Sequence, residues 1–310
     1  MTTESLKQAL ALRARSLLQP RSTNAALAAA AAPLTALIVL GIGLAIIDAL
    51  PVGVFYDDAM YVILGKSLAT GHGYRWLNLP GTPPATHFPP GYPALLAAIW
   101  RAFPNFPANV LAFKAANAVL LAVASGALVL LARRRFGFSP LAAATLTISG
   151  CAVIPVLTLS SVVLSEPLFL ALLIPVLLFA EVVVDSERRG RDLVLLGLLA
   201  GVATLVRTHG IALVFGLALA LALRQPAIAS RRDDRRTSPR GRLKDATLLL
   251  LSAALLILPW QLWVHANQSV LPEPLRGLYE SYTSWIANGL KAEGPGMLWN
   301  TLVRTSLTTA

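Results

Sequence analysis

The sequence predicts an all-α membrane protein: a polytopic transmembrane bundle of about seven helices, with two amphipathic surface helices in its first outer loop. Of the 310 residues, 56% are hydrophobic and 13% are charged, and the mean hydropathy is +0.66. The apolar residues also come in blocks about as long as the hydrocarbon core of a bilayer is thick. We therefore expect one transmembrane domain over residues 1–310.

The basic residues predict the orientation of this bundle. Eighteen of the 26 Lys and Arg lie in four short segments outside the apolar blocks. These segments are residues 1–24, 133–135, 188–191 and 224–244. Because cytoplasmic loops are enriched in Lys and Arg, the formal charge of +11 indicates topology and not nucleic-acid binding. We expect a cytoplasmic N-terminus at 1–24 and a basic cytoplasmic loop at 224–244.

Seven crossings are expected from stretches with few or no charges. At 1.5 Å per residue, about 20 apolar residues cross a bilayer. The crossings are residues 25–47, 108–132, 141–164 with a kink at Pro155, 165–184, the two halves of 193–223, and 246–264. Residues 51–106 then form the first outer loop, and residues 265–310 form an outer tail.

The run 193–223 is divided because Arg207-Thr208-His209-Gly210 interrupts it. Basic residues flank the run on both sides, so both flanks should be cytoplasmic, and a single crossing would place one of them outside. Two short helices that meet at residues 207–210 satisfy this rule. They form either a hairpin of tilted spans or a re-entrant pair packed inside the protein.

The first outer loop opens with FYDDAMYVILGKSLATGHGY, residues 55–74. Apolar residues at spacings of three and four predict an amphipathic helix over 58–70, on which Asp58 and Tyr61 face away from the apolar stripe. This helix should lie along the membrane surface, and a second short apolar helix is expected at 94–103. Asp57 is either the N-cap of the first helix or, beside Asp58, one of two carboxylates that raise each other's pKa and suit a general base.

Further polar residues are expected on the same outer side. Glu166 either complements the dipole of the helix that follows Ser165 or belongs to a functional site. Arg207, beside His209, either forms a structural ion pair with Asp48 or Glu166, or binds an anionic ligand. His87 lies in a proline-rich turn, where structural packing is the alternative to a binding role.

No cofactor is predicted from these residues. The four histidines lack the spacing of metal ligands, and the chain has no glycine-rich phosphate loop. The prediction is therefore that no metal is bound, although the sequence leaves a divalent cation open.

The order of the first span, DDAMY, LATGHGY, PPGYPALLAA, SEPLF and LVRTHG resembles the GT-C membrane glycosyltransferases, in particular the protein O-mannosyltransferases and the bacterial aminoarabinose transferases. The resemblance covers roughly residues 30–225. It implies an enzyme of the bacterial cytoplasmic membrane that moves a sugar from a polyprenyl-phosphate carrier to a lipid, glycan or protein acceptor on the outer face.

The resemblance also implies roles for single residues. Asp57 stands at the place of the catalytic aspartate, and Asp58 at that of the acid after it. Aminoarabinose transferases have a lysine immediately before the double proline, where this chain has Phe88, preceded by His87. We expect Asp57 or Asp58 to be the base, and Arg207 to hold the leaving phosphate. The remaining expected substrate-binding residues are Glu166, His87, Tyr61 and His209.

Two other classes of function stay open. A secondary transporter would also place acids and an arginine between broken helices, but it would carry paired inverted repeats, which the sequence does not display. The second open class is a non-catalytic membrane scaffold or a relative that has lost activity. Members of the resembled group usually carry more spans and a soluble outer domain, so we expect this chain to lack further C-terminal parts.

Overall fold

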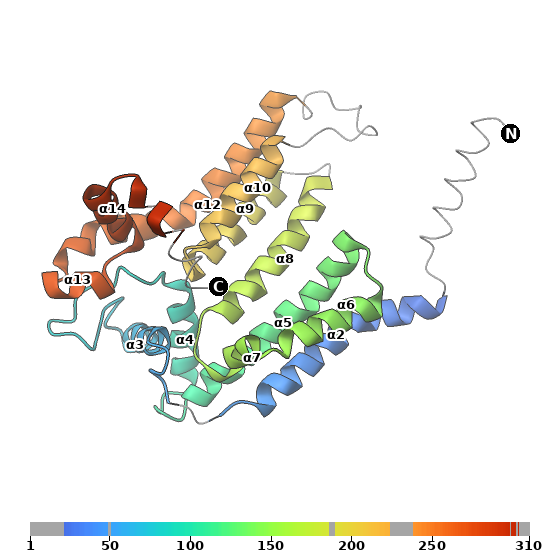
Figure 1. Cartoon of the computed structure of the whole chain (residues 1–310), viewed down its shortest axis with the longest axis horizontal. Coiled ribbons are helices and arrows are strands. Elements are labelled where there is room, and N and C mark those ends of the chain that lie inside the picture. Colours follow the sequence, from blue (N-terminus) through green and yellow to red (C-terminus); the bar gives the residue numbers. More distant parts are fainter. Residues whose placement is uncertain are drawn as a thin grey trace.

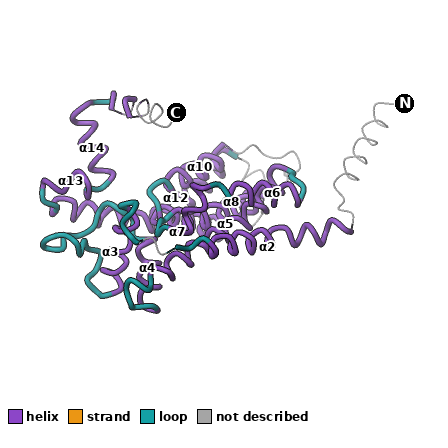
Figure 2. The backbone as a smooth tube through the Cα atoms, turned by 60° about the horizontal axis from the view of Figure 1, so that its bottom comes forward, coloured by secondary structure: helices purple, strands orange, loops and turns teal. Residues whose placement is uncertain are grey.

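The computed structural model describes residues 22–48, 51–185, 190–223, 238–297, 299–301 and 303. Within these residues every regular element is a helix, as Figure 2 shows, and the only strand-like feature is one isolated bridge between Arg75 and Pro84. The predicted all-α class is thus confirmed for the described part. Most of the two expected cytoplasmic segments, 1–24 and 224–244, and the last residues of the expected outer tail lie outside it.

The helices differ widely in length. In chain order they are α2 (Ser22–Ala45), α3 (Asp57–Ala69), α4 (Gly91–Ala102), α5 (Val110–Phe136), α6 (Pro140–Cys151), α7 (Ile154–Ser161), α8 (Glu166–Asp185), α9 (Gly190–Val206), α10 (Gly210–Leu223), α12 (Pro239–Asn267), the 3-10 helix η2 (Gln268–Val270), α13 (Glu273–Tyr279) and α14 (Tyr282–Glu293).

Four helices of the described residues, α2, α5, α8 and α12, are long and apolar enough to cross a membrane. The pair α6 and α7 makes a fifth if it is one span, and it bends by 69° just before Pro155. Helices α9 and α10 have 17 and 14 residues, about 25 and 21 Å, which is short for a hydrocarbon core of about 30 Å. A helix lies at each of the seven predicted crossings, but length and composition support four or five spans.

The spans pack in two groups, which lie side by side in Figure 1. One group, α8, α9, α10 and α12, shares a core that includes Leu193, Leu196 and Leu249. Small residues let its helices approach closely, since a Cβ on Gly197 of α9 would lie 2.5 Å from the carbonyl oxygen of Leu249 in α12. The other group, α2, α5 and α6, packs around Val129, and α5 joins it to α8.

Helices α9 and α10 form an antiparallel hairpin (Figure 1), with its turn at residues 207–209. This turn lies at the same end of the bundle as α4, because a Cβ on Gly91 would lie 2.7 Å from the carbonyl oxygen of Leu205. The two short helices that the interrupted apolar run predicted are therefore present.

A cap covers this end of the bundle. It consists of residues 51–109, with α3 and α4, and of residues 268–297, with α13 and α14. Helix α4 has the expected single buried face, along Tyr92, Leu96 and Trp100. Helix α3 has the predicted position but not the predicted polar face.

Tyr61 and Asp58 on that face of α3 are buried together with its apolar residues. The reason is tertiary: the loop between α3 and α4 folds back and places the ring of Phe88 4.8 Å, and that of Tyr92 5.0 Å, from the ring of Tyr61. The surface helix predicted at 58–70 is instead a core helix of the cap.

The end of α12 and the tail hold the loop of the cap in place. Trp263 of α12 donates its indole N–H to the carbonyl of Ala85 at 3.0 Å. The ring of Tyr279, at the end of α13, lies 5.0 Å from that of Trp76. Segments about 200 residues apart therefore form one body at this end of the bundle.

Candidate functional site

The chain enters α3 through a strained turn. The N–H of Asp57 donates to the carbonyl of Phe55 at 2.6 Å, and Tyr56 between them has φ 59° and ψ −61°. This is a γ-turn with positive φ, a rare and strained conformation for a residue with a side chain. Tyr56 occupies the N-cap position, and Asp57 is the first helical residue. The interpretation of Asp57 as an N-cap is therefore wrong.

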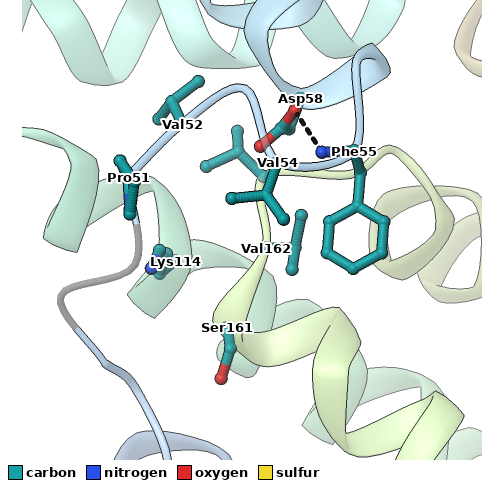
Figure 3. A pocket seen from close by; sticks show the side chains of 9 residues that line it. Pro51, Val52, Val54, Phe55, Asp58, Lys114, Ser161 and Val162 are labelled. Atoms are coloured by element: carbon teal, nitrogen blue, oxygen red, sulfur yellow. Dashed lines mark hydrogen bonds between the residues drawn. The ribbon is translucent and has the colours of Figure 1, made fainter.

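Both oxygens of the Asp58 carboxylate accept hydrogen bonds from the backbone around it. One oxygen accepts the N–H of Gly53 at 2.8 Å, and the other accepts those of Ala59 at 2.9 Å and Phe55 at 3.3 Å. Only 2% of the residue is exposed. Figure 3 shows this carboxylate above a small pocket that Phe55 and Lys114 also line, with the bond to Phe55 dashed. Asp58 fixes the loop that precedes α3.

The carboxylate of Asp57, by contrast, is half-buried and has no hydrogen-bond partner among the described residues. Burial raises its pKa above the usual aspartate value; the nearby His87 and Arg207 lower it, and Glu166 and Asp58 raise it. A carboxylate that is free of hydrogen bonds, close to two basic side chains and raised in pKa has the properties of a general base.

Arg207 lies in a polar network with the start of α8. Its Nη1 contacts Glu166 Oε1 at 2.6 Å and donates to Ser165 Oγ at 3.1 Å, and Ser165 Oγ also bonds the Tyr61 hydroxyl at 2.9 Å. Of the two ion pairs considered for Arg207, the one with Glu166 is therefore present. Asp48 pairs with Lys114 at 3.0 Å instead.

The pairing leaves part of the network open. Within the described residues, the other guanidinium nitrogens of Arg207 make no hydrogen bond, and the buried Oε2 of Glu166 has no partner. The side chain of Arg207 is 25% exposed. An anionic ligand can therefore still approach Arg207.

His87 connects the site to the tail. Its Nδ1 lies 2.5 Å from the carbonyl oxygen of Glu280, which can only accept, so Nδ1 carries a hydrogen and Nε2 remains for another partner. Its ring lies 4.6 Å from that of Tyr282. Burial raises the pKa of the Tyr282 hydroxyl, and the charge of Asp57 raises it further. Tyr282 is thus within electrostatic reach of the Asp57 carboxylate.

Five of the expected site residues come together here: Asp57, Tyr61, His87, Glu166 and Arg207. Asp58 is next to them but is committed to its loop. His209 does not lie at this site. It is exposed, and its side chain makes no interaction within the described part of the chain. The reason is that His209 lies in the turn between α9 and α10, two residues beyond Arg207.

One structural residue of the site was not predicted. Asn117 of α5 donates to the carbonyls of Val162 and Leu164, both at 3.0 Å, and accepts from the Tyr92 hydroxyl at 3.0 Å. It thereby fixes the segment that leads into Ser165. An asparagine inside an apolar run was the available signal for it, because a buried amide must be satisfied.

The described residues contain no group of three or more His, Cys, Asp or Glu side chains that could hold a metal ion. Comparison of the chain with protein-family models, with curated proteins and with solved structures found no match. The site is therefore interpreted from its own geometry and from the motifs in the sequence.

Proposed function

We propose that the chain is a membrane glycosyltransferase of the GT-C type. It takes a sugar from a polyprenyl-phosphate carrier and transfers it to a lipid, glycan or protein acceptor on the outer face of the membrane. The observation that carries the proposal is the contrast between the two adjacent carboxylates: Asp58 is committed to three backbone N–H groups, whereas Asp57 is free and raised in pKa.

The proposed reaction needs a base and a cation. Asp57 removes the proton from the acceptor hydroxyl, whose oxygen forms a bond to the anomeric carbon of the sugar. The bond from that carbon to the carrier phosphate breaks, and its electron pair leaves with the phosphate oxygen. The nitrogens of Arg207 that Glu166 does not occupy stabilise that negative charge.

The remaining residues support this assignment. His87 has its Nε2 available for a ligand, since its Nδ1 is held by the Glu280 carbonyl. It stands one residue before the place where aminoarabinose transferases have a lysine. We assign it a contact with the donor. Tyr61 orients Ser165, and through it Arg207.

The test compares purified protein with its Asp57→Asn variant. A polyprenyl-phosphate sugar labelled in the sugar is supplied, and both donor binding and transfer are measured. Asp57→Asn should retain donor binding and lose on the order of a hundredfold or more in turnover. Asp192→Asn, the same change in the first turn of α9 at the opposite end of the bundle, is the control.

Two results would count against the proposal. If Asp57→Asn transfers sugar at the parental rate, Asp57 is not the general base. Movement of the intact donor across a vesicle membrane without cleavage of the sugar–phosphate bond indicates a transporter instead.

A further inference from the structure

An open groove lies between α12 and α14. Its volume is about 440 Å³, within the range of small-molecule sites, roughly 300–1,000 Å³. The α12 wall carries Leu258, Leu262 and His265, and the α14 wall carries Thr283, Ser284 and Ala287. None of the residues above enters the proposed transfer step.

The two leucines continue an apolar stripe that runs down α12. Leu251, Leu255, Leu258 and Leu262 follow one another at spacings of four, three and four, so they share one face of the helix. Each is more than half exposed. Since α12 is one of the helices long and apolar enough to cross a membrane, this stripe is suited to contact the acyl chains of lipids.

The stripe becomes polar where it enters the groove. His265 and Gln268 follow the leucines along α12 and η2, Gln261 lies on the same wall next to Leu262 in the chain, and α14 places Thr283 and Ser284 opposite them. Ser284 donates to the side-chain carbonyl of Gln268 at 2.5 Å, which fixes the two walls relative to each other. The surface thus changes from apolar to hydrogen-bonding within about two helical turns.

We propose that this groove binds a membrane lipid of the leaflet at the cap end, with one acyl chain along the leucine stripe and a hydroxyl-bearing head group between α12 and α14. An acyl chain matches Leu258 and Leu262. Among the described residues, the groove wall contains no Asp, Glu, Lys or Arg, and its amides and hydroxyls both donate and accept, so it matches hydroxyl groups better than a bare charge.

The groove also adjoins the candidate site. Thr283, in its wall, follows Tyr282, whose ring lies 4.6 Å from that of His87 and whose hydroxyl lies in the field of Asp57. A lipid head group in the groove is therefore close to where the acceptor hydroxyl must come. The identification of this lipid as the acceptor rests on the proposed function, whereas lipid binding itself does not.

The test is photo-crosslinking in nanodiscs of phosphatidylcholine with a minor fraction of phosphatidylglycerol, whose head group carries two hydroxyls. A benzophenone side chain replaces Ala287 in the groove wall. The control carries it at Asn288, the next residue, which points toward Glu280 of the cap. We expect phosphatidylglycerol adducts at position 287, enriched over its fraction in the nanodisc, and few at position 288.

Gln261→Leu and Gln268→Leu, introduced singly, should each lower the enrichment by about fivefold, the equivalent of one hydrogen bond at about 1 kcal/mol. Asp57→Asn should leave the adduct unchanged, so failure of sugar transfer and failure of lipid binding give different results. Equal adducts at 287 and 288, or an enrichment that neither glutamine affects, would overturn the proposal. Unfolding temperatures of the variants show whether a lost adduct reflects a lost fold.

Discussion

Replacing each of the two adjacent aspartates by asparagine should separate their roles by stability alone. In Asp58→Asn only one side-chain oxygen remains as an acceptor. Whichever way the amide turns, it loses either the 2.8 Å bond from Gly53 or the bonds from Phe55 and Ala59, and its NH₂ then faces a backbone N–H. Hydrogen bonds to a charged group contribute about 1.5–3 kcal/mol, so we expect Asp58→Asn to lower stability by about 2–3 kcal/mol.

Asp57→Asn should change the stability of the protein in the opposite direction. The pKa of Asp57 is raised in the folded protein, so the folded state binds its proton more tightly than the unfolded chain does. The stabilisation that the protonated Asp57 side chain contributes is complete below the unfolded pKa and is lost as the pH rises through the folded pKa. Above the folded pKa the ionised carboxylate therefore costs stability, and an uncharged asparagine removes that cost.

Thermal unfolding of both variants in the same detergent measures the difference. Asp58→Asn should unfold roughly 4–12 °C below the parent, and Asp57→Asn at or above it. The reasoning is wrong if Asp57→Asn unfolds as early as Asp58→Asn, because Asp57 would then hold a structural contact of similar strength.

Three further predictions concern the site and its orientation. The turnover of sugar transfer should rise with pH through a pKa above the usual aspartate value, because burial keeps Asp57 protonated to higher pH; a pH–rate profile that is flat across the acid range contradicts this. Arg207→Lys should keep the ion pair with Glu166 but weaken binding of the polyprenyl-phosphate donor, because lysine cannot bond both groups with a planar fork; unchanged donor affinity would make Arg207 purely structural. An impermeant thiol reagent on intact cells should label Asn78→Cys and not Ser238→Cys, and the reverse pattern would invert the orientation.

The main features of the bundle were predictable because they depend on local sequence. The turn at Arg207 was predicted because a charged and a polar residue interrupt an apolar run that has basic flanks on both sides. The bounds of α3 were predicted to within one residue, since its apolar spacing and Gly71, which has φ +79°, are local signals. The number of spans was not established, because α9 and α10 are too short for length to decide.

The features of the site that were missed are non-local. Tyr61 is buried by Phe88 and Tyr92, from the far side of a loop, and no periodicity in α3 could report that. The segment 265–310 was expected only as an outer tail, yet it supplies the carbonyl of Glu280 and the ring of Tyr282 to His87. Such contacts between residues about 200 positions apart leave no pattern in a single sequence.

The adjacency of two carboxylates is explained by the turn that precedes them. A γ-turn at Tyr56 costs on the order of 1–3 kcal/mol, and it persists only where the surroundings hold it. The three backbone bonds to Asp58 lie on both sides of that turn, at Gly53, Phe55 and Ala59, and together they exceed this cost. Without them the chain could relax and Asp57 could move to the N-cap position, where the N–H groups of its own helix would occupy its carboxylate. From the next position in the chain, the carboxylate of Asp58 therefore holds the turn that leaves Asp57 free to accept a proton.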